Sequence, residues 1–344
     1  MTQAVLCATL AGLDDHDTGR WHPERPARLA AVERALADDL VREVIAPLEP
    51  RQATLDELAI AHDRFYLETV EQFVTSGGGA LDADTMTSKG SWETALWAAG
   101  TGLAAVEGLS SAGAGAAFVG IRPPGHHATT NRAMGFCLIN NVAVVAATLA
   151  ARGERVAILD WDVHQGNGTQ EIFWDEPRVL YASMHEHPAY PGTGLAVEVG
   201  GEGARGMNVN VPLPEGSTGE GALAAFDEII GPAVSAFAPD WLLVSAGYDA
   251  HRADPLAGLA WSAGDYGLLS TRSAGLMTEA GRVIVFLEGG YDLDALSASV
   301  TATVAALAGV EGIQAEAPTN GGPGRAAIRE ASAVRRRALE GERS

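Results

Sequence analysis

Two side chains in the segment Asp-Trp-Asp-Val-His, residues 160–164, have the types and spacing needed to bind one metal ion. Asp162 and His164 stand two positions apart, and residues two apart in an extended segment point to the same side. Asp254, much later in the chain, could supply a third ligand. An Asp/His/Asp set leaves a fourth position of the ion open for water or substrate, which is typical of catalytic rather than structural zinc.

Similar polar clusters follow five predicted strands. The clusters are Arg122-Pro-Pro-Gly-His126-His127, Asp160 to Gly168, Ser183-Met184-His185, Ser245 to Pro255 and Glu288-Gly-Gly-Tyr291. A single Asp or His at a strand end is commonly a helix cap or a turn former. Five clusters are better explained by one binding site, because ligands of open α/β sheets gather beyond the carboxyl ends of the strands.

The elements that would position these clusters alternate along the chain. Short β-branched runs predict strands at Gln3–Ala8, Ala116–Ile121, Arg155–Leu159, Val179–Met184, Met207–Pro212, Trp241–Ala246 and Arg282–Leu287. Ala-rich segments predict helices at Pro26–Leu40, Arg64–Val74, Lys89–Leu109, Leu138–Arg152, Gly219–Ala236, Ser262–Ala280 and Leu293–Leu307. This alternation indicates an α/β fold with a mostly parallel central sheet and helices on both faces.

The chain has 344 residues and no long linker, so we expect one domain over residues 1–312. Residues 313–344 are expected to be a tail or an appended helix. Two distant cysteines and the lack of a leader or a long apolar run indicate a cytoplasmic protein without a membrane span. The net charge of -21 disfavours nucleic acid and favours a cationic substrate, although acidity can also reflect solubility alone.

Six ordered motifs resemble those of the histone deacetylase family. They are R-P-P-G-H-H-A, M-G-F-C-x-x-N-N, L-D-W-D-V-H-Q-G-N-G-T-Q, Y-P-G-T-G, S-A-G-Y-D-A-H-x-x-D-P-L and L-E-G-G-Y. The N-terminal H-P-E-R-P is similar to the first loop of that family, and the resemblance runs from about residue 10 to 310. The sequence is most similar to the class II and bacterial amidohydrolase-like branch, which implies the arginase/deacetylase-like fold.

The resemblance implies two cation sites. Zn²⁺ would be held by Asp162, His164 and Asp254. A structural K⁺ would lie beneath it, held by Asp160 and Ser183 together with backbone carbonyls of Asp162, His164 and Met184. A second K⁺ site is not predicted, since Met207 stands where some relatives have tyrosine.

The resemblance also implies the catalytic groups and the substrate tunnel. His126 and His127 would lie beside the attacking water, and Tyr291 would hydrogen-bond the substrate carbonyl. Phe136 and Tyr190 would form aromatic walls for an acyl-lysine chain, with Gly135 beside them.

The two histidines should differ, because the family pattern pairs His126 with Asp160 and His127 with Asn167. A carboxylate raises the pKa of a histidine much more than a neutral amide does. We therefore expect His127 to be the general base and acid, and His126 to act mainly through its charge.

Several polar residues are left out of the metal site. His22, His185, His187 and His251 are explained by turn or capping roles, and Asp249 is expected to be a structural hydrogen-bond acceptor. Gln165 stands where many relatives have a second histidine, and this difference does not affect the proposed chemistry.

Three functions remain open: a lysine deacetylase, an acetylpolyamine amidohydrolase and a non-catalytic binding protein on the same fold. The substrate would be an acetyl-lysine peptide or an acetylated cationic small molecule, and a homo-oligomer is possible. Neither an acidic gate after Asp254 nor a long insertion before Tyr190 is present, which favours acyl-lysine. An arginase-type manganese enzyme would need additional Asp ligands.

Overall fold

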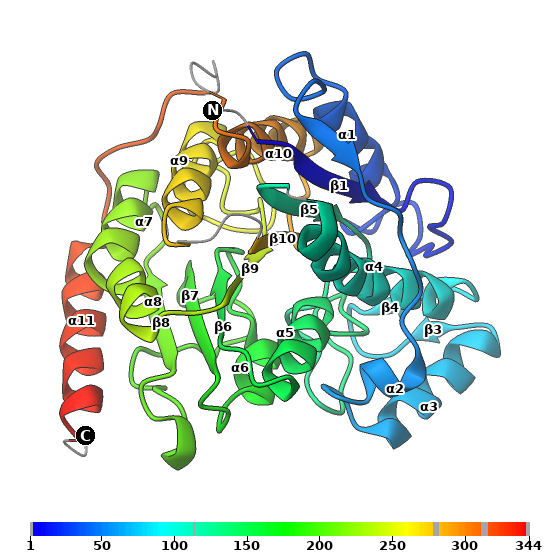
Figure 1. Ribbon diagram of the computed structural model, residues 1–344, viewed down its shortest axis with the longest axis horizontal. Helices are drawn as coiled ribbons and strands as arrows, with labels where there is room; N and C mark the ends of the chain where they lie inside the picture. Colours follow the sequence, from blue (N-terminus) through cyan, green and yellow to red (C-terminus); the bar gives the residue numbers. More distant parts are fainter. Residues whose placement is uncertain (1–2, 113, 278–281, 311–315, 342–344) are drawn as a thin grey trace.

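Eight parallel strands form the central sheet of the computed structural model, which describes residues 3–112, 114–277, 282–310 and 316–341 (Figure 1). The strand order is β2-β1-β5-β10-β9-β6-β7-β8. The strands are β1 (Val5–Thr9), β2 (Ile45–Pro47), β5 (Ala116–Gly120), β6 (Val156–Asp160), β7 (Val179–Glu186), β8 (Asn208–Leu213), β9 (Trp241–Ala246) and β10 (Val283–Leu287). β3 (Gly79–Ala80) and β4 (Met86–Thr87) make a separate antiparallel pair.

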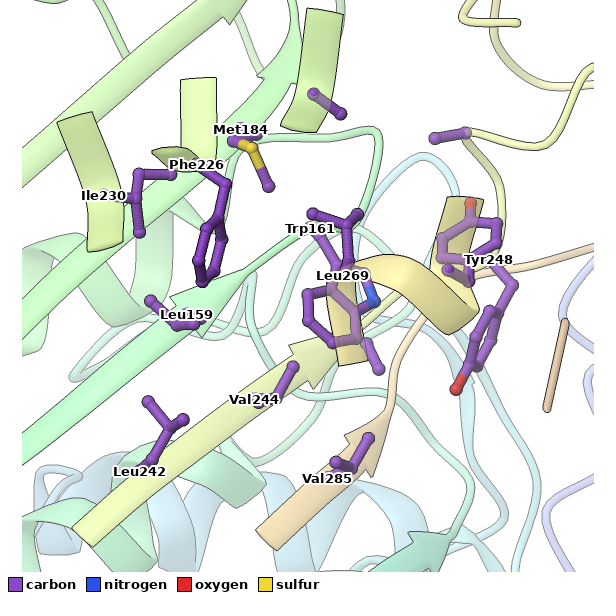
Figure 2. Close-up of a cluster of buried hydrophobic side chains, with 14 of the residues drawn as sticks. Leu159, Trp161, Met184, Phe226, Ile230, Leu242, Val244, Tyr248, Leu269 and Val285 are labelled. Atoms are coloured by element: carbon purple, nitrogen blue, oxygen red, sulfur yellow. The ribbon is translucent and has the colours of Figure 1, made fainter. Parts of the chain in front are cut away.

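Both faces of the sheet are buried, because successive strand residues point to opposite sides and both sides are apolar. On β9, Leu242 and Val244 pack into one core while Leu243 packs into the other. Figure 2 shows the first of these cores, where Phe226 and Leu269 meet the strands. The predicted mostly parallel sheet with helices on both faces is confirmed.

The helices divide between the two faces (Figure 1). One core receives side chains of α1 (Ala27–Leu36), α7 (Gly219–Ala225), α8 (Gly231–Phe237), α9 (Ala263–Ala274) and α10 (Leu293–Leu307). The other receives those of α2 (Leu55–Leu58), α3 (Arg64–Thr75), α4 (Ser91–Ala112) and α5 (Asn141–Ala151). The short α6 (Asn167–Ile172) follows β6.

One predicted helix, Gly219–Ala236, is interrupted in the structure. A π-helical turn, Phe226–Ile230, separates α7 from α8, and the Gly231 N–H bonds the carbonyl of Phe226 five residues earlier. Pro232 has no N–H to continue the α-helical ladder, which accounts for the change of register. The elements that the sequence did not predict, among them β2, α2 and α6, are short, so their periodicity is weak.

The C-terminal helix α11 (Arg325–Glu340) packs beside the edge strand β8 (Figure 1). Ile328, Ala331 and Val334 are buried on its inner face. The predicted boundary at residues 312 and 313 and the end of the predicted helix Ser262–Ala280 lie outside the described residues. Within those residues, no helix is long and apolar enough to cross a membrane.

Candidate active site

The carboxyl end of β6 begins the site. Asp162 and His164 lie in the turn that follows, where the His164 N–H donates to Asp162 Oδ1 at 2.9 Å. Asp162 Oδ1 is also 3.2 Å from His164 Nδ1, and the Gly289 N–H donates to Asp162 Oδ2 at 2.8 Å. The two side chains that the spacing placed together therefore do converge on one point.

Asp249, which follows β9, completes a group of three residues that could bind one metal ion. One ligand atom each from Asp162, His164 and Asp249 lies within 4.8 Å of the others. Asp249 Oδ1 accepts the Val163 N–H at 2.9 Å, as a structural acceptor would. Its Oδ2 is buried without a hydrogen-bond partner and lies 3.3 Å from His164 Nδ1. Burial, Asp162 and Asp254 together raise the pKa of Asp249 to about 7. These donors fit a divalent cation, whose positive charge would offset the repulsion between the Asp249 carboxylate and its acidic neighbours.

Asp254 is placed differently. Its Oδ2 accepts the N–H groups of Tyr291 at 2.7 Å and Asp292 at 3.2 Å, and its Oδ1 accepts that of Leu256 at 3.0 Å. It lies outside the three-residue group but close enough to influence the pKa of Asp249. Its predicted role as the third ligand stays a prediction, and Asp249 was expected to be a structural hydrogen-bond acceptor rather than a member of the metal group.

The two adjacent histidines have the partners expected from the sequence. His126 Nδ1 lies 3.0 Å from Asp160 Oδ2, and His127 Nδ1 lies 2.8 Å from Asn167 Oδ1. The hydroxyl of Tyr181, which sequence reasoning missed, donates to the same Asp160 oxygen at 3.0 Å. The imidazoles are therefore fixed by a carboxylate on one side and an amide on the other.

Their protonation differs as a consequence. Burial lowers the pKa of His126, but the carboxylates of Asp160 and Asp162 outweigh it and raise that pKa to about 10. Burial holds the pKa of His127 well below its usual range, and the neighbouring His126 and His164 lower it further. His126 is thus charged and His127 neutral near pH 7.

A cavity of about 190 Å³ opens above these groups. Its lining is Asp84, His127, Gly135, Phe136, His164, Tyr190, Leu256 and Tyr291. The rings of Phe136 and Tyr291 pack edge to face, with their centroids 5.9 Å apart. The rings of His127 and Tyr190 pack in the same way, with their centroids 5.1 Å apart. A cavity with these aromatic walls could hold an apolar chain beside His127, His164 and Tyr291.

Two glycines are required by close packing. A Cβ on Gly135 would lie 2.4 Å from the ring of His127, and Gly135 has a φ of +56°. A Cβ on Gly289 would lie 2.0 Å from Asp249 Oδ2. The glycines around the motifs thus serve both as turn residues and as points of close approach.

Asp84 and Leu256 line the cavity without having been predicted. Asp84 comes from the loop between β3 and β4, far from every motif used above. Leu256 is two residues after Asp254. Leu256 could have been found from that adjacency, whereas nothing in the sequence signals Asp84.

Three of the predicted K⁺ ligands lie on the neighbouring strands β6 and β7, and Asp162 and His164 lie in the turn after β6. Asp160 of β6 and Ser183 of β7 are register partners, and Met184 follows on β7. Asp160 Oδ1 accepts the Asp162 N–H at 3.1 Å, and Ser183 Oγ is 2.9 Å from His185 Nδ1. His185 also contacts the carbonyl of Gly194, so it has a structural role here.

Comparisons with known proteins agree with this arrangement. The histone deacetylase domain matches residues 22–307. The chain is 40% identical over 302 residues to a probable deacetylase of Archaeoglobus fulgidus, covering 86% of this chain and 84% of that protein. It is 38% identical over 244 residues to a histone deacetylase-like amidohydrolase of Pseudomonas aeruginosa, covering 70% and 64%.

A solved structure of a related protein has the same fold. The crystal structure of the HDA15 HD domain superposes with a TM-score of 0.88 at 35% identity, covering 97% of this chain and 95% of that chain. The single-domain fold with its parallel sheet is therefore the fold of that neighbour. On the domain match, the sequence relatives and this structure, the chain belongs to the histone deacetylase family.

Proposed function

We propose that the protein is a zinc-dependent deacetylase that hydrolyses the acetamide of acetyl-lysine or a similar acetylated amine. The observation that carries the proposal is the cavity, whose lining combines a neutral His127, His164 of the metal group and Tyr291. Family membership supports a hydrolase of the deacetylase and amidohydrolase type.

Zinc would be held by Asp162 and His164 with Asp254, and Asp249 Oδ2 would be available at the same centre. When bound, the ion would supply acidification of water and polarisation of the acetyl carbonyl. The proposed K⁺ would be held by Asp160, Ser183 and the neighbouring backbone carbonyls.

The protein's own groups perform the proton transfers. His127 Nε2 accepts the proton of the attacking water, since its Nδ1 is engaged with Asn167. As the water oxygen bonds to the acetyl carbon, the phenol of Tyr291 donates to the developing oxyanion. His127 then returns the proton to the amine nitrogen, the C–N bond breaks, and the acid and the amine produced exchange a proton and leave as acetate and an ammonium group. His126 stays charged and stabilises the negative charge of the intermediate.

The substrate chain would lie in the cavity lined by Phe136 and Tyr190, whose aromatic rings would cover the aliphatic part of a lysine side chain. A net charge of -21 favours cationic substrates and disfavours nucleic acid. The two buried, free cysteines suit the reducing cytoplasm that we propose as the location.

An acetylpolyamine amidohydrolase is the second candidate. Asp84 favours it, because this carboxylate lines the cavity and could attract a second ammonium group. Leu256 argues for acyl-lysine, because the residue that lines the cavity just after Asp254 is apolar. We rank acetyl-lysine first because, among the residues that the structure describes, no acidic residue follows Asp254 at the cavity, and we keep the polyamine alternative for the test.

The test is kcat/KM of the zinc-loaded protein on an acetyl-lysine peptide and on acetylspermidine and acetylputrescine, measured side by side. Tyr291→Phe is the control and should lower turnover about 10²- to 10³-fold. Preference for the peptide supports the lysine deacetylase, and preference for polyamines transfers the assignment to the second candidate. Inactivity of the metal-verified protein on all three would contradict the proposed function.

A further inference from the structure

Glu24, in the His-Pro-Glu-Arg-Pro segment, has no role in the mechanism described above, yet it is a fully buried carboxylate. It accepts hydrogen bonds from Nε and Nη2 of Arg122, the latter at 2.7 Å, and from Nη1 of Arg28 at 3.2 Å. His16 Nε2 lies 3.3 Å from it. Although burial opposes ionisation, Arg122 and His16 hold the pKa of Glu24 well below its usual range. Glu24 is therefore a charged group between two buried guanidinium groups.

Arg28, on α1, carries this contact to the turn that positions Tyr291. Its Nε donates to the Gly290 carbonyl at 2.7 Å, and its Nη2 donates to the Glu288 carbonyl. The guanidinium carbon lies 5.1 Å from the centroid of the Tyr291 ring. The position of the phenol thus depends directly on where Arg28 is held.

Arg122 carries the same contact to the two histidines. It precedes the Pro-Pro-Gly turn that ends at His126, and its Nη1 is also paired with Asp14. On the other side of that turn, the N–H groups of Gly125 and His126 donate to Glu288 Oε2 at 2.7 and 3.2 Å. The histidine turn and the tyrosine turn are therefore joined by Glu288 on one side and by the Arg122–Glu24–Arg28 bridge on the other.

The charges of this bridge are matched. Arg28 and Arg122 are positive, Glu24 and Asp14 are negative, and each arginine is completely buried. A buried ion pair often contributes little net stability, so the effect of this bridge on the geometry of the two turns matters more than its contribution to stability. The two bonds that Arg28 makes to the tyrosine turn indicate what that geometry serves.

We propose that Glu24 is a positioning residue, which fixes Tyr291 relative to His126 and His127 by holding Arg28 and Arg122 together. This inference rests on the proposed function for the roles of the three catalytic groups. It predicts that disturbing Glu24 affects turnover more than substrate binding, because misplacement by about 1 Å can cost about 10²-fold in rate.

The experiment compares Glu24→Asp and Glu24→Gln with wild type, using the full chain loaded with zinc. Glu24→Asp keeps the charge and shortens the reach by one methylene, so it remains informative if Glu24→Gln does not fold. Arg34→Gln is the control, since Arg34 makes an ion pair from α1 to Asp294 of α10 that is exposed and does not contact the turn before Tyr291. Zinc content and the thermal midpoint are measured for each variant.

We expect kcat of Glu24→Asp on the acetyl-lysine peptide to fall about tenfold while KM changes less than about twofold. In a Tyr291→Phe background the same substitution should lower kcat by about threefold or less, because part of its effect acts through the position of the phenol. Arg34→Gln should match wild type in both constants.

A second readout does not depend on activity. Protein labelled with 3-fluorotyrosine gives a ¹⁹F resonance for Tyr291, identified by its loss in Tyr291→Phe. Glu24→Asp should shift this resonance, and Arg34→Gln should leave it in place. An unmoved resonance, or an unchanged kcat with only a lowered thermal midpoint, would overturn the positioning role. Wild-type inactivity would instead remove the proposed function while leaving the resonance test intact.

Discussion

Buried carboxylates and histidines crowd the carboxyl ends of β6 and β9, whereas a few residues earlier the same strands carry only apolar side chains. We call the first region the rim, formed by the polar residues at the carboxyl ends of β5, β6, β7, β9 and β10. The second is the strand interior, where Ile158, Leu242 and Leu243 are completely buried. Apolar burial stabilises the interior and does not depend on the direction of each contact. Each buried polar group of the rim, in contrast, requires a partner with defined geometry. The rim should therefore control activity and the interior stability.

Removal of the metal should break the rim most completely. Dialysis against a chelator is expected to lower kcat/KM by about 10⁴-fold or more, because acidified water and carbonyl polarisation are both lost. Zinc should restore the activity, and far-ultraviolet circular dichroism should remain unchanged because the interior holds the fold. Full activity after verified removal would contradict a metal-dependent rim.

Truncation of one histidine should divide the rim into its two functions. His127→Ala is expected to lower kcat about 10³-fold, since the proton shuttle is lost. His126→Ala should lower it less, because its contribution is electrostatic. Steady-state kinetics at matched zinc content checks the order. If His126→Ala abolished turnover and His127→Ala left it nearly intact, the assignment of the base would be wrong.

A cavity in the interior should show the opposite pattern. Leu243→Ala on β9 is expected to lower the free energy of unfolding by about 3 kcal/mol, through lost apolar burial and the void that remains. Denaturant unfolding measures this loss, and kcat at 25 °C should stay within about twofold of wild type. A large fall in kcat at full folding would show that the two regions are not separable.

The pH dependence of stability should come from buried histidines near the rim. His62 accepts the Asn140 N–H at 2.9 Å and faces the Thr129 carbonyl at 2.9 Å, and burial lowers its pKa from 6.5 to about 4. The unfolded chain then binds more protons than the folded one between these values, so stability is lost as the pH falls from about 6.5 towards 4.

At pH 5 the expected loss from His62 is about 2 kcal/mol relative to pH 7.5. Urea unfolding of wild type and His62→Gln at both values measures it, with the variant expected to lose less by about that amount. Equal losses in both proteins would mean that His62 does not remain neutral in the folded state.

The smallest expected effect concerns Asp84 in the lining of the cavity. Asp84→Asn should lower kcat/KM about tenfold for a substrate with a second positive charge and less than about threefold for a neutral-flanked acetyl-lysine peptide. The charge effect should weaken as salt is raised. An equal loss on both substrates would indicate a steric role for Asp84 rather than charge recognition.

The sequence predicted the fold because its signals are local. Continuous apolar runs such as the one at residues 241–244 need two covered faces, and the residues after each run identify the polar ends of the strands. Six motifs were then enough to indicate the family. Short elements such as β3 and β4 escaped, since two residues carry no periodicity.

Contacts between distant segments were decided only in three dimensions. The placement of Asp84 in the cavity, of Asp249 beside His164 and of Glu24 between two arginines depends on loops that meet across the sheet. The sequence by itself determined which chemical groups follow the strands, because each group is adjacent to its strand in the order of residues along the chain. The tertiary structure decided which of them touch, because side-chain partners are set by the packing of segments far apart in sequence.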